Sequence, residues 1–214
     1  MSKFTIGSVK ALSGLTRRAL AGGMAAMLVI AVPAQAAFSE GYKFLESVKK
    51  KEGEKVEQAL MDSPTIVNAR DVSTGETALH IVVARRDLTW LRYLVQKGAN
   101  VNQADDRGRT PLQQAINLGW REGAEYLVES KASTESTNDA GETPLISAVH
   151  RRDTQLMKVL LEAGADPDRA DNSGRSARDY AKHDGEDSNL VATINTYARK
   201  DAGKNAKPIY GPVF

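Results

Sequence analysis

The 214-residue chain contains no cysteine, which excludes disulfides, thiolate metal sites, a cysteine nucleophile and the acylated cysteine of a lipoprotein. Aromatic residues are scarce, at 6%, and this argues against a β-sandwich rich in tryptophan and tyrosine. The sequence has no nucleophile elbow, zinc-protease helix, Walker loop or dinucleotide fingerprint. With 41% hydrophobic and 26% charged residues, its composition is still that of a globular chain with one or two domains.

The first 36 residues contain no acidic side chain. Residues 1–18 are basic, residues 19–32 form a run of small and apolar side chains, and Pro33 ends that run. Alanine then stands at positions 34 and 36. This order of basic, apolar and small residues predicts a secretory signal peptide that is cleaved before Ala37. The apolar run is short for a membrane span, which disfavours the alternative of an uncleaved anchor. We expect a bacterial periplasmic protein with no membrane contact after cleavage; a pair of arginines in the leader leaves the export route open.

The charge of the remaining chain differs from that of the whole. The predicted signal peptide holds four of the 29 basic residues and none of the 27 acidic ones, so the remainder has a net charge of −2 where the whole chain has +2. A slightly acidic protein offers no electrostatic argument for binding nucleic acid. We therefore expect no nucleic-acid partner.

The rest of the chain repeats every 33 residues, a period typical of stacked structural repeats. Glycine recurs at this spacing at Gly75, Gly108, Gly141 and Gly174. Two residues after each glycine stands a hydroxyl residue, at Thr77, Thr110, Thr143 and Ser176. About twenty residues further on, a third landmark reads Gly98-Ala99, Lys131-Ala132 and Gly164-Ala165. Because several independent features share one period, the repeat is not a coincidence.

The strings Thr77-Ala-Leu-His, Thr110-Pro-Leu-Gln and Thr143-Pro-Leu-Ile resemble the Thr-Pro-Leu-His motif of the ankyrin repeat family. The resemblance covers about residues 71–200, and a degenerate helical half-repeat precedes it. It implies an all-α ankyrin-repeat solenoid, in which each repeat is a β-turn tip followed by two antiparallel helices. It also implies the family's usual role of binding other proteins, with the partner unidentified. No cofactor is expected.

The chemistry of the repeated residues favours the same architecture. Each threonine can accept hydrogen bonds from free backbone N–H groups and cap a first helix, and Pro111 and Pro144 stand at the first helical position, where no N–H is needed. The four repeated glycines suit a turn tip with positive φ. Apolar residues recur at helical spacing over 88–95 and 156–161. Each unit would bury its faces only against its neighbours, so the ends of the stack need polar caps.

These landmarks divide the chain into seven segments. They are a signal peptide 1–36, an N-terminal capping half-repeat 37–70, ankyrin repeats 71–104, 105–137 and 138–170, a C-terminal capping repeat 171–200 and a disordered tail 201–214. In the N-terminal cap we expect a loose start over 37–43, helices around 44–48 and 56–61, and a turn at Gly53.

A few positions depart from the repeated pattern. Ala78 replaces proline in the first full repeat. In repeat 105–137, Lys131 replaces the glycine that ends the second helix, and Gly123 lies inside that helix, where glycine costs roughly 1 kcal/mol relative to alanine. In the last unit Arg178 replaces a core leucine, as expected for a polar end of the stack.

Three histidines are the candidates for catalysis or metal binding. His80 stands at the histidine of the motif, and the resemblance implies a structural role for it between adjacent repeats. His150 and His183 end consecutive first helices and could approach each other, but two imidazoles without a third ligand make a poor zinc site. The acidic pair 105–106 is read as a solvated turn, because the ligand spacing of a calcium loop is missing. We therefore expect neither a metal site nor an enzyme.

The resemblance implies a partner-binding surface on the concave face, formed by the turn tips and the exposed ends of the first helices. The basic tip residues Arg107 and Arg109 are expected to pair with the flanking acids. Trp120 is either a hot spot for the partner or packs over the loop of the next repeat. The predicted partner-binding residues are Ser73, Thr74, Glu76, Arg85, Asp106, Arg107, Arg109, Asn117, Trp120, Asp139, Glu142, His150, Arg151 and Arg175.

The leading hypothesis is a monomeric, non-enzymatic adaptor of the periplasm that holds a protein partner on this face. A preformed surface suits that role, because it loses little entropy on binding. An alternative is an accessory or chaperone-like subunit that stabilises a periplasmic enzyme, and the sequence does not separate it from the first. A third hypothesis, a metal-dependent hydrolase, would use His150 and His183.

Overall fold

The computed structural model describes residues 34–183, 185 and 188–198, with side chains from Glu40 onward. The contacts divide the chain into residues 1–32 and 33–214, and all described residues belong to the second unit. The predicted signal peptide up to residue 33 and the predicted tail 201–214 lie outside the described residues.

The described residues form helices that come in pairs along the chain. In chain order they are α1 (Ala34–Lys50), α2 (Gly53–Asp62), the 3-10 helix η1 (Pro64–Asn68), α3 (Ala78–Ala84), α4 (Leu88–Gln96), α5 (Pro111–Asn117), α6 (Arg121–Glu129), α7 (Pro144–His150), α8 (Thr154–Glu162), α9 (Ala177–His183) and α10 (Asn189–Tyr197). In this part of the chain, β structure is limited to two isolated bridges, Arg70 with Thr77 and Ala170 with Ser176. The predicted all-α class is confirmed.

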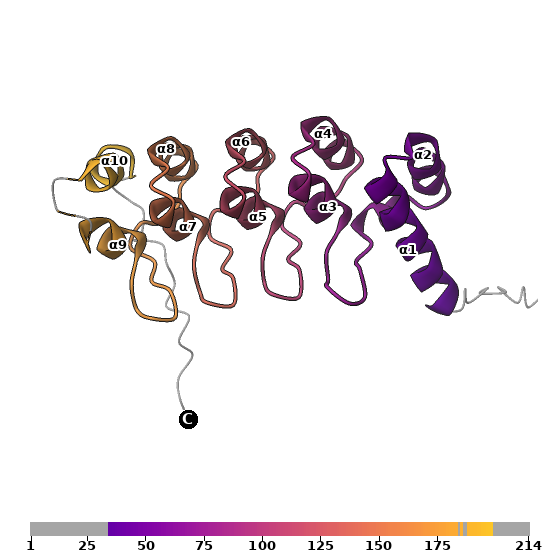
Figure 1. The fold of residues 1–214 in the computed structure, drawn as a ribbon, viewed down its shortest axis with the longest axis horizontal. Helices are drawn as coiled ribbons and strands as arrows, with labels where there is room; N and C mark the ends of the chain where they lie inside the picture. The colour runs from indigo at the N-terminus through magenta and orange to yellow at the C-terminus, as the bar shows by residue number, and fades with distance from the viewer. Residues whose placement is uncertain (1–33, 184, 186–187, 199–214) are drawn as a thin grey trace, which may run out of the picture. The chain divides into compact units, whose positions relative to one another are not determined.

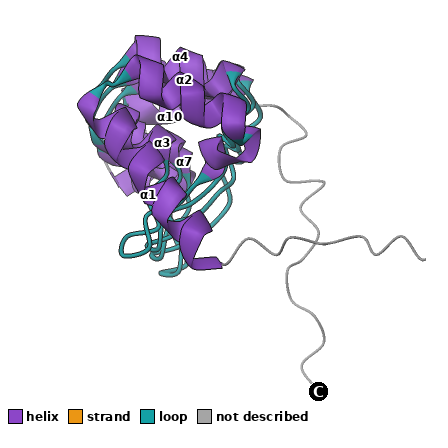
Figure 2. Cartoon of the chain, turned by 90° about the vertical axis from the view of Figure 1, so that its right-hand side faces the viewer, coloured by secondary structure: helices purple, strands orange, loops and turns teal. Residues whose placement is uncertain are grey.

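The helix pairs lie side by side in one row (Figure 1). The first helices α1, α3, α5, α7 and α9 contact one another in sequence, and each packs on the second helix of its own pair. Seen along the row, the connecting loops project together from one side (Figure 2). None of the described helices combines the length and apolarity needed to cross a membrane.

The repeated hydroxyl residues cap the first helices, as predicted. Thr110 Oγ1 accepts a hydrogen bond from the Gln113 backbone N–H at 3.3 Å, and Thr143 Oγ1 accepts one from the Ile146 N–H at 3.2 Å. Pro111 occupies the first position of its helix, where the missing N–H leaves no bond unmade. The caps therefore fix where each first helix begins.

The glycines before these caps stand at turn tips with positive φ, also as predicted. Their φ angles are 69°, 71°, 77° and 78°, at Gly75, Gly108, Gly141 and Gly174. Lys131 adopts the same left-handed region, with φ 67°, where the other repeats carry glycine. A side chain there is strained, because its Cβ crowds the backbone.

A side chain at the third position of a first helix links each of two repeats to the next. Nδ1 of His80 accepts from the Thr77 N–H at 3.1 Å, and Nε2 lies 2.9 Å from the Arg109 carbonyl oxygen. A carbonyl can only accept, so Nε2 carries the proton and the ring is neutral. In the next repeat Gln113 does the same work, because its amide accepts from the Thr110 N–H and donates to the Glu142 carbonyl at 2.9 Å.

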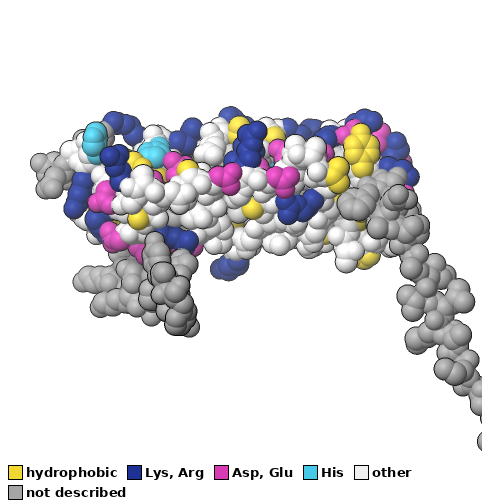
Figure 3. Space-filling model, turned by 90° about the horizontal axis from the view of Figure 1, so that it is seen from below, with side chains coloured by type: hydrophobic (Ala, Val, Ile, Leu, Met, Phe, Trp, Pro, Cys, Tyr) yellow, Lys and Arg dark blue, Asp and Glu magenta, His cyan; other side chains and the backbone are white. Residues whose placement is uncertain are grey.

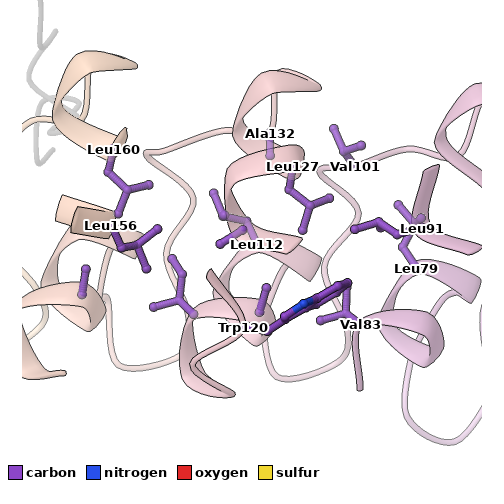
Figure 4. Close-up of a cluster of buried hydrophobic side chains, with 14 of the residues drawn as sticks. Leu79, Val83, Leu91, Val101, Leu112, Trp120, Leu127, Ala132, Leu156 and Leu160 are labelled. Atoms are coloured by element: carbon purple, nitrogen blue, oxygen red, sulfur yellow. The ribbon is translucent and has the colours of Figure 1, made fainter. Parts of the chain in front are cut away.

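The core runs through the whole row without a break. Trp120 belongs to it: the residue is only 8% exposed, and Figure 4 shows the indole pointing toward Val83 of the preceding repeat. This burial speaks against the hot-spot interpretation of Trp120, and the packing that Figure 4 shows is against the preceding repeat. The ring also covers Gly123, where any Cβ would clash with it, so this glycine is a requirement of the packing.

Two details of the N-terminal pair differ from the prediction. Residues 37–43 belong to α1 where a loose start was expected, since alanine, glutamate and lysine favour helix and Lys43 pairs with Glu40 at 2.8 Å. Gly53 is the first residue of α2 and no turn. The chain reverses at Lys51 instead, which has φ 59°.

The C-terminal pair has a polar outer position, as expected for a cap. Nε of Arg178 donates to Asp168 Oδ1 at 2.6 Å, and its Nη1 donates to the amide oxygen of Asn195 at 3.1 Å. The Arg178 guanidinium thus links the loop that precedes α9 with helix α10. An internal repeat would carry a leucine at this position.

We expect Gly123→Ala to destabilise the protein, although alanine is the better helix former. The added methyl group clashes with the Trp120 ring, and overpacking of this kind costs about 1–3 kcal/mol. Urea unfolding followed by circular dichroism measures the change. The matched control is Gly53→Ala, where a Cβ meets no atom within 4 Å, and a gain of roughly 0.5–1 kcal/mol is expected. Stabilisation by both variants would contradict the packing of Trp120.

We expect His80→Gln to flatten the dependence of stability on pH. Burial lowers the pKa of His80 below its usual 6.5, so the unfolded chain takes up a proton that the folded chain refuses. The histidine's contribution is therefore complete above about pH 6.5 and is lost as the pH falls, by at most about 1.4 kcal/mol per pH unit. Glutamine keeps both hydrogen bonds, as Gln113 does, and does not titrate. Identical slopes for both proteins between pH 7 and 5 would refute this.

Candidate protein-binding surface

The four turn tips and the ends of the first helices form one continuous face, here called the tip face. It comprises residues 71–76, 105–109, 138–142 and 171–175, together with 84–85, 117–118, 150–151 and 183. The tips project from the same side of the row (Figures 1 and 2). Figure 3, seen from that side, shows basic and acidic side chains interspersed along it.

Each tip is held in shape by one carboxylate or amide oxygen. Oδ1 of Asp105 accepts from the backbone N–H groups of Arg107 and Arg109, both at 2.9 Å. Asn138 and Asp171 make the equivalent pairs of bonds in the next two tips. In the first tip Asp71 has this role one position earlier, and the hydrogen bonds from Ser73 lower its pKa. The tips are therefore preformed turns.

This shaping residue was missed by the sequence analysis, which read 105–106 as a solvated acidic turn. Asp105 is in fact buried, with 2% of its side chain exposed. Burial alone would raise its pKa, but the hydrogen bonds from Arg109 and the tip backbone outweigh that effect and lower it. The signal was present, since Asp105, Asn138 and Asp171 stand three residues before successive glycines at the same 33-residue spacing.

Neighbouring tips also touch one another. The Asp106 N–H donates to the Thr74 carbonyl at 3.0 Å, and Nη2 of Arg70 donates to Asp106 Oδ1 at 2.8 Å. At the other end of the row, the Asn172 side-chain amide donates to the Asp139 carbonyl at 2.9 Å. These bonds fix the spacing of the first two tips and of the last two, so a partner would meet a set geometry at each end of the tip face.

The expected pairing of the tip arginines with the flanking acids is corrected by the structure. Nε and Nη2 of Arg109 donate to Oδ2 of Asp105 at 2.9 and 2.7 Å, so Arg109 braces its own tip. Glu142 instead accepts from Asn138 at 3.1 Å. Arg107 is exposed, and within the described residues its guanidinium has no acidic partner.

Two other predicted arginines hold repeats together. Nη1 of Arg85 donates to the Val48 carbonyl of the N-terminal pair, and its guanidinium lies 5.3 Å from the centre of the Trp90 ring. Nη1 of Arg151 donates to the Asn117 carbonyl at 3.0 Å. Both side chains therefore contribute to the stack, where the sequence analysis assigned them to a partner.

The remaining predicted residues stay at the surface. Ser73 and Thr74 form the first tip, in which the Ser73 hydroxyl donates to Asp71 at 2.5 Å. Glu76 and Glu142 are half-buried, whereas the other side chains are exposed. The exposed predicted residues are Ser73, Thr74, Asp106, Arg107, Asn117, Asp139, His150, Arg151 and Arg175.

The histidines do not assemble into a metal centre. Across the described residues, no three His, Asp or Glu side chains are grouped so that they could hold an ion. Both ring nitrogens of His80 are hydrogen-bonded between two repeats. The His150 ring stands edge-on to Tyr180, with 4.5 Å between ring centres. The hydrolase hypothesis therefore receives no support from the geometry.

Comparison with known proteins agrees with this architecture. A family model described as "Ankyrin repeats (3 copies)" matches residues 44–138, and one described as "Ankyrin repeats (many copies)" matches residues 127–181. The chain is an ankyrin repeat protein. Ankyrin repeats imply protein partners in general, and these matches are consistent with a binding protein that has no catalytic site.

Several curated proteins are similar to this ankyrin repeat protein over short stretches. Neurogenic locus notch homolog protein 4 of Homo sapiens is 42% identical over 65 residues, which are 30% of this chain and 3% of that protein. Diacylglycerol kinase iota of Rattus norvegicus is 37% identical over 68 residues, 31% of this chain and 6% of that protein. Putative ankyrin repeat protein FPV031 of Fowlpox virus is 34% identical over 59 residues, 28% of this chain and 17% of that protein. The chain thus spans a small part of each relative's length.

We expect Arg109→Ala and Arg107→Ala to differ sharply in stability. Removal of Arg109 leaves the buried Asp105 carboxylate without its side-chain donor, at a cost of about 1–3 kcal/mol. Removal of the exposed Arg107 changes the free energy of unfolding by no more than about 0.5 kcal/mol. Chemical denaturation of both variants measures this, and equal losses would show that Arg109 does not brace the tip.

Proposed function

We propose that this ankyrin repeat protein is a non-enzymatic adaptor that binds a protein partner on its tip face. The observation that carries the proposal is the set of preformed tips: backbone hydrogen bonds to Asp105, Asn138 and Asp171 hold each turn before any partner arrives. Because these turns are already ordered, binding them demands little further loss of conformational entropy. The exposed side chains on such turns are then available for recognition.

The distribution of the arginines sharpens this proposal. Arg85, Arg109 and Arg151 are engaged within the stack, whereas Arg107 stands exposed at the centre of the row. An arginine with a free planar fork is suited to pair with a partner's carboxylate in bidentate fashion. Arg107 is therefore the first residue to test.

We expect Arg107→Glu to reduce recovery of the partner about tenfold or more in pull-downs from a lysate of the source organism, because reversal of a central charge opposes an acidic partner surface. The matched control is Arg92→Glu on α4, an exposed position outside the tip face that loses only a contact with the Tyr126 ring. Mass spectrometry identifies what each bait retains. Equal recovery of every protein by the parent and Arg107→Glu would remove the tip face from consideration.

We further propose that the protein is exported to the periplasm by the signal sequence in residues 1–36. The support is the order of basic, apolar and small residues in that segment. Cleavage after Ala36 would also keep the folded stack whole, since the buried side chains of α1 described here are Phe44, Leu45, Ser47 and Val48.

Expression in a bacterium, followed by fractionation and N-terminal sequencing, tests this export. We expect mature protein in the periplasmic fraction that begins at Ala37. A variant with Ala34→Glu and Ala36→Glu should accumulate uncleaved, because the peptidase needs small residues at both positions. A cytoplasmic protein that begins at Met1 would refute the proposal.

A further inference from the structure

A pocket of about 320 Å³ lies between the last two helix pairs, at the C-terminal end of the tip face. Its lining comes from α7, the turn after it, the last tip, α9 and α10. Figure 3 shows two histidine patches at this end of the row, with basic side chains between them. The pocket therefore has walls from both of these helix pairs and opens on the tip face.

Among the described residues, the lining is basic and contains no acid. Its polar side chains are those of His150, Arg152, Arg175, Tyr180 and His183. Arg175 contributes a permanently charged guanidinium group, whereas Arg152 has a further interaction of its own, and the imidazoles can donate hydrogen bonds from their ring nitrogens. Such a lining attracts an anion.

Two acids among the described residues that contact this lining are already engaged. Oε1 of Glu142 lies 3.7 Å from Nδ1 of His150, and Oε2 accepts from Asn138 at 3.1 Å. Oδ2 of Asp171 accepts from the Tyr180 hydroxyl at 2.7 Å. Burial would raise the pKa of Asp171, but its hydrogen bonds from Ser173, Tyr180 and the tip backbone outweigh this and lower it. Neither acid forms an ion pair with Arg175 among the described contacts.

The aromatic wall is held in place before any ligand binds. The hydrogen bond to Asp171 fixes the Tyr180 hydroxyl, and the ring meets His150 edge-on at an interplanar angle of 77°. The Arg175 guanidinium lies 5.8 Å from the centre of the same ring. The cation thus sits over a fixed ring, which limits the freedom it would lose on pairing with a carboxylate.

The apolar part of the lining selects among anions. Val149 and Leu190 contribute hydrocarbon surface to the pocket, and a bare inorganic ion gains nothing from such contacts. A glutamate side chain offers both parts, a methylene stem for the apolar lining and a planar carboxylate for the arginine fork.

We propose that this pocket receives the glutamate side chain of an acidic segment in the protein partner. The proposal rests on the proposed binding role of the tip face and names the chemistry that one part of it recognises. Arg175 is the residue that pairs with the carboxylate, Tyr180 positions it, and His150 and His183 flank the entrance.

The test is a titration of the full chain with a blocked peptide of four glutamates, followed by NMR of the imidazole signals near pH 6.5. The chain has only three histidines, so buried His80 is an internal reference. We expect the signals of His150 and His183 to move and saturate while that of His80 stays in place. Arg175→Gln should weaken binding about tenfold or more, and Arg92→Gln, at an exposed position of α4 outside the tip face, should leave it unchanged.

Four results would overturn the pocket proposal. They are equal shifts with a four-glutamine peptide, undiminished binding by Arg175→Gln, saturation by inorganic phosphate at a lower concentration than the peptide, and saturation by anionic lipid vesicles in place of the peptide. Any of them, combined with loss of the partner by Arg107→Glu in the pull-down, refutes the pocket and leaves the adaptor role standing. Retention of every partner by Arg107→Glu refutes the adaptor role whatever the titration shows.

Discussion

The hydrogen bonds that pass from one repeat to the next set the register of this protein. His80 and Gln113 each bond the backbone that begins their own helix and the carbonyl that closes the following tip. One side chain therefore aligns two units at a time. The third repeat carries Ile146 at the same position, buried and without such a bond. There the link to the last unit is made by Asn172, whose side-chain amide donates to the Asp139 carbonyl at 2.9 Å.

This register explains why the tips are ordered while their side chains remain free. The backbone groups of each tip are satisfied within the row, by a shaping carboxylate or amide and by neighbouring tips, so that no partner is needed to complete them. The side chains then divide into those that brace the stack, such as Arg109, and those that face outward, such as Arg107. The stacked helices fix the geometry of the tip face, and the outward-facing side chains determine which partner it would bind.

Much of the fold was predictable from the sequence because the signals are local. A threonine cap, a proline at the first helical position and a glycine with positive φ each depend on a few adjacent residues, and their common period assembles them into a stack. The start of α1 and the position of Gly53 were misjudged because helix ends depend on weak preferences that several residues share.

The candidate site was less predictable, because an exposed and an engaged arginine look alike in sequence. Arg109 pairs with Asp105 four residues earlier, whereas Arg85 reaches a carbonyl 37 residues away, a contact that has no local signature. Trp120 went to the core because Gly123, one helical turn later, leaves room for its ring. The pairing of Trp120 with Gly123 can be identified only from the packed structure.

Backbone ¹⁵N relaxation of the unbound protein tests the central claim most directly. If the tips are preformed, residues 71–76, 105–109 and 138–142 have order parameters close to those of the helices, near 0.85. Values below about 0.6 throughout the tips, beside rigid helices, would show that the tips are ordered only by a partner and would contradict this account.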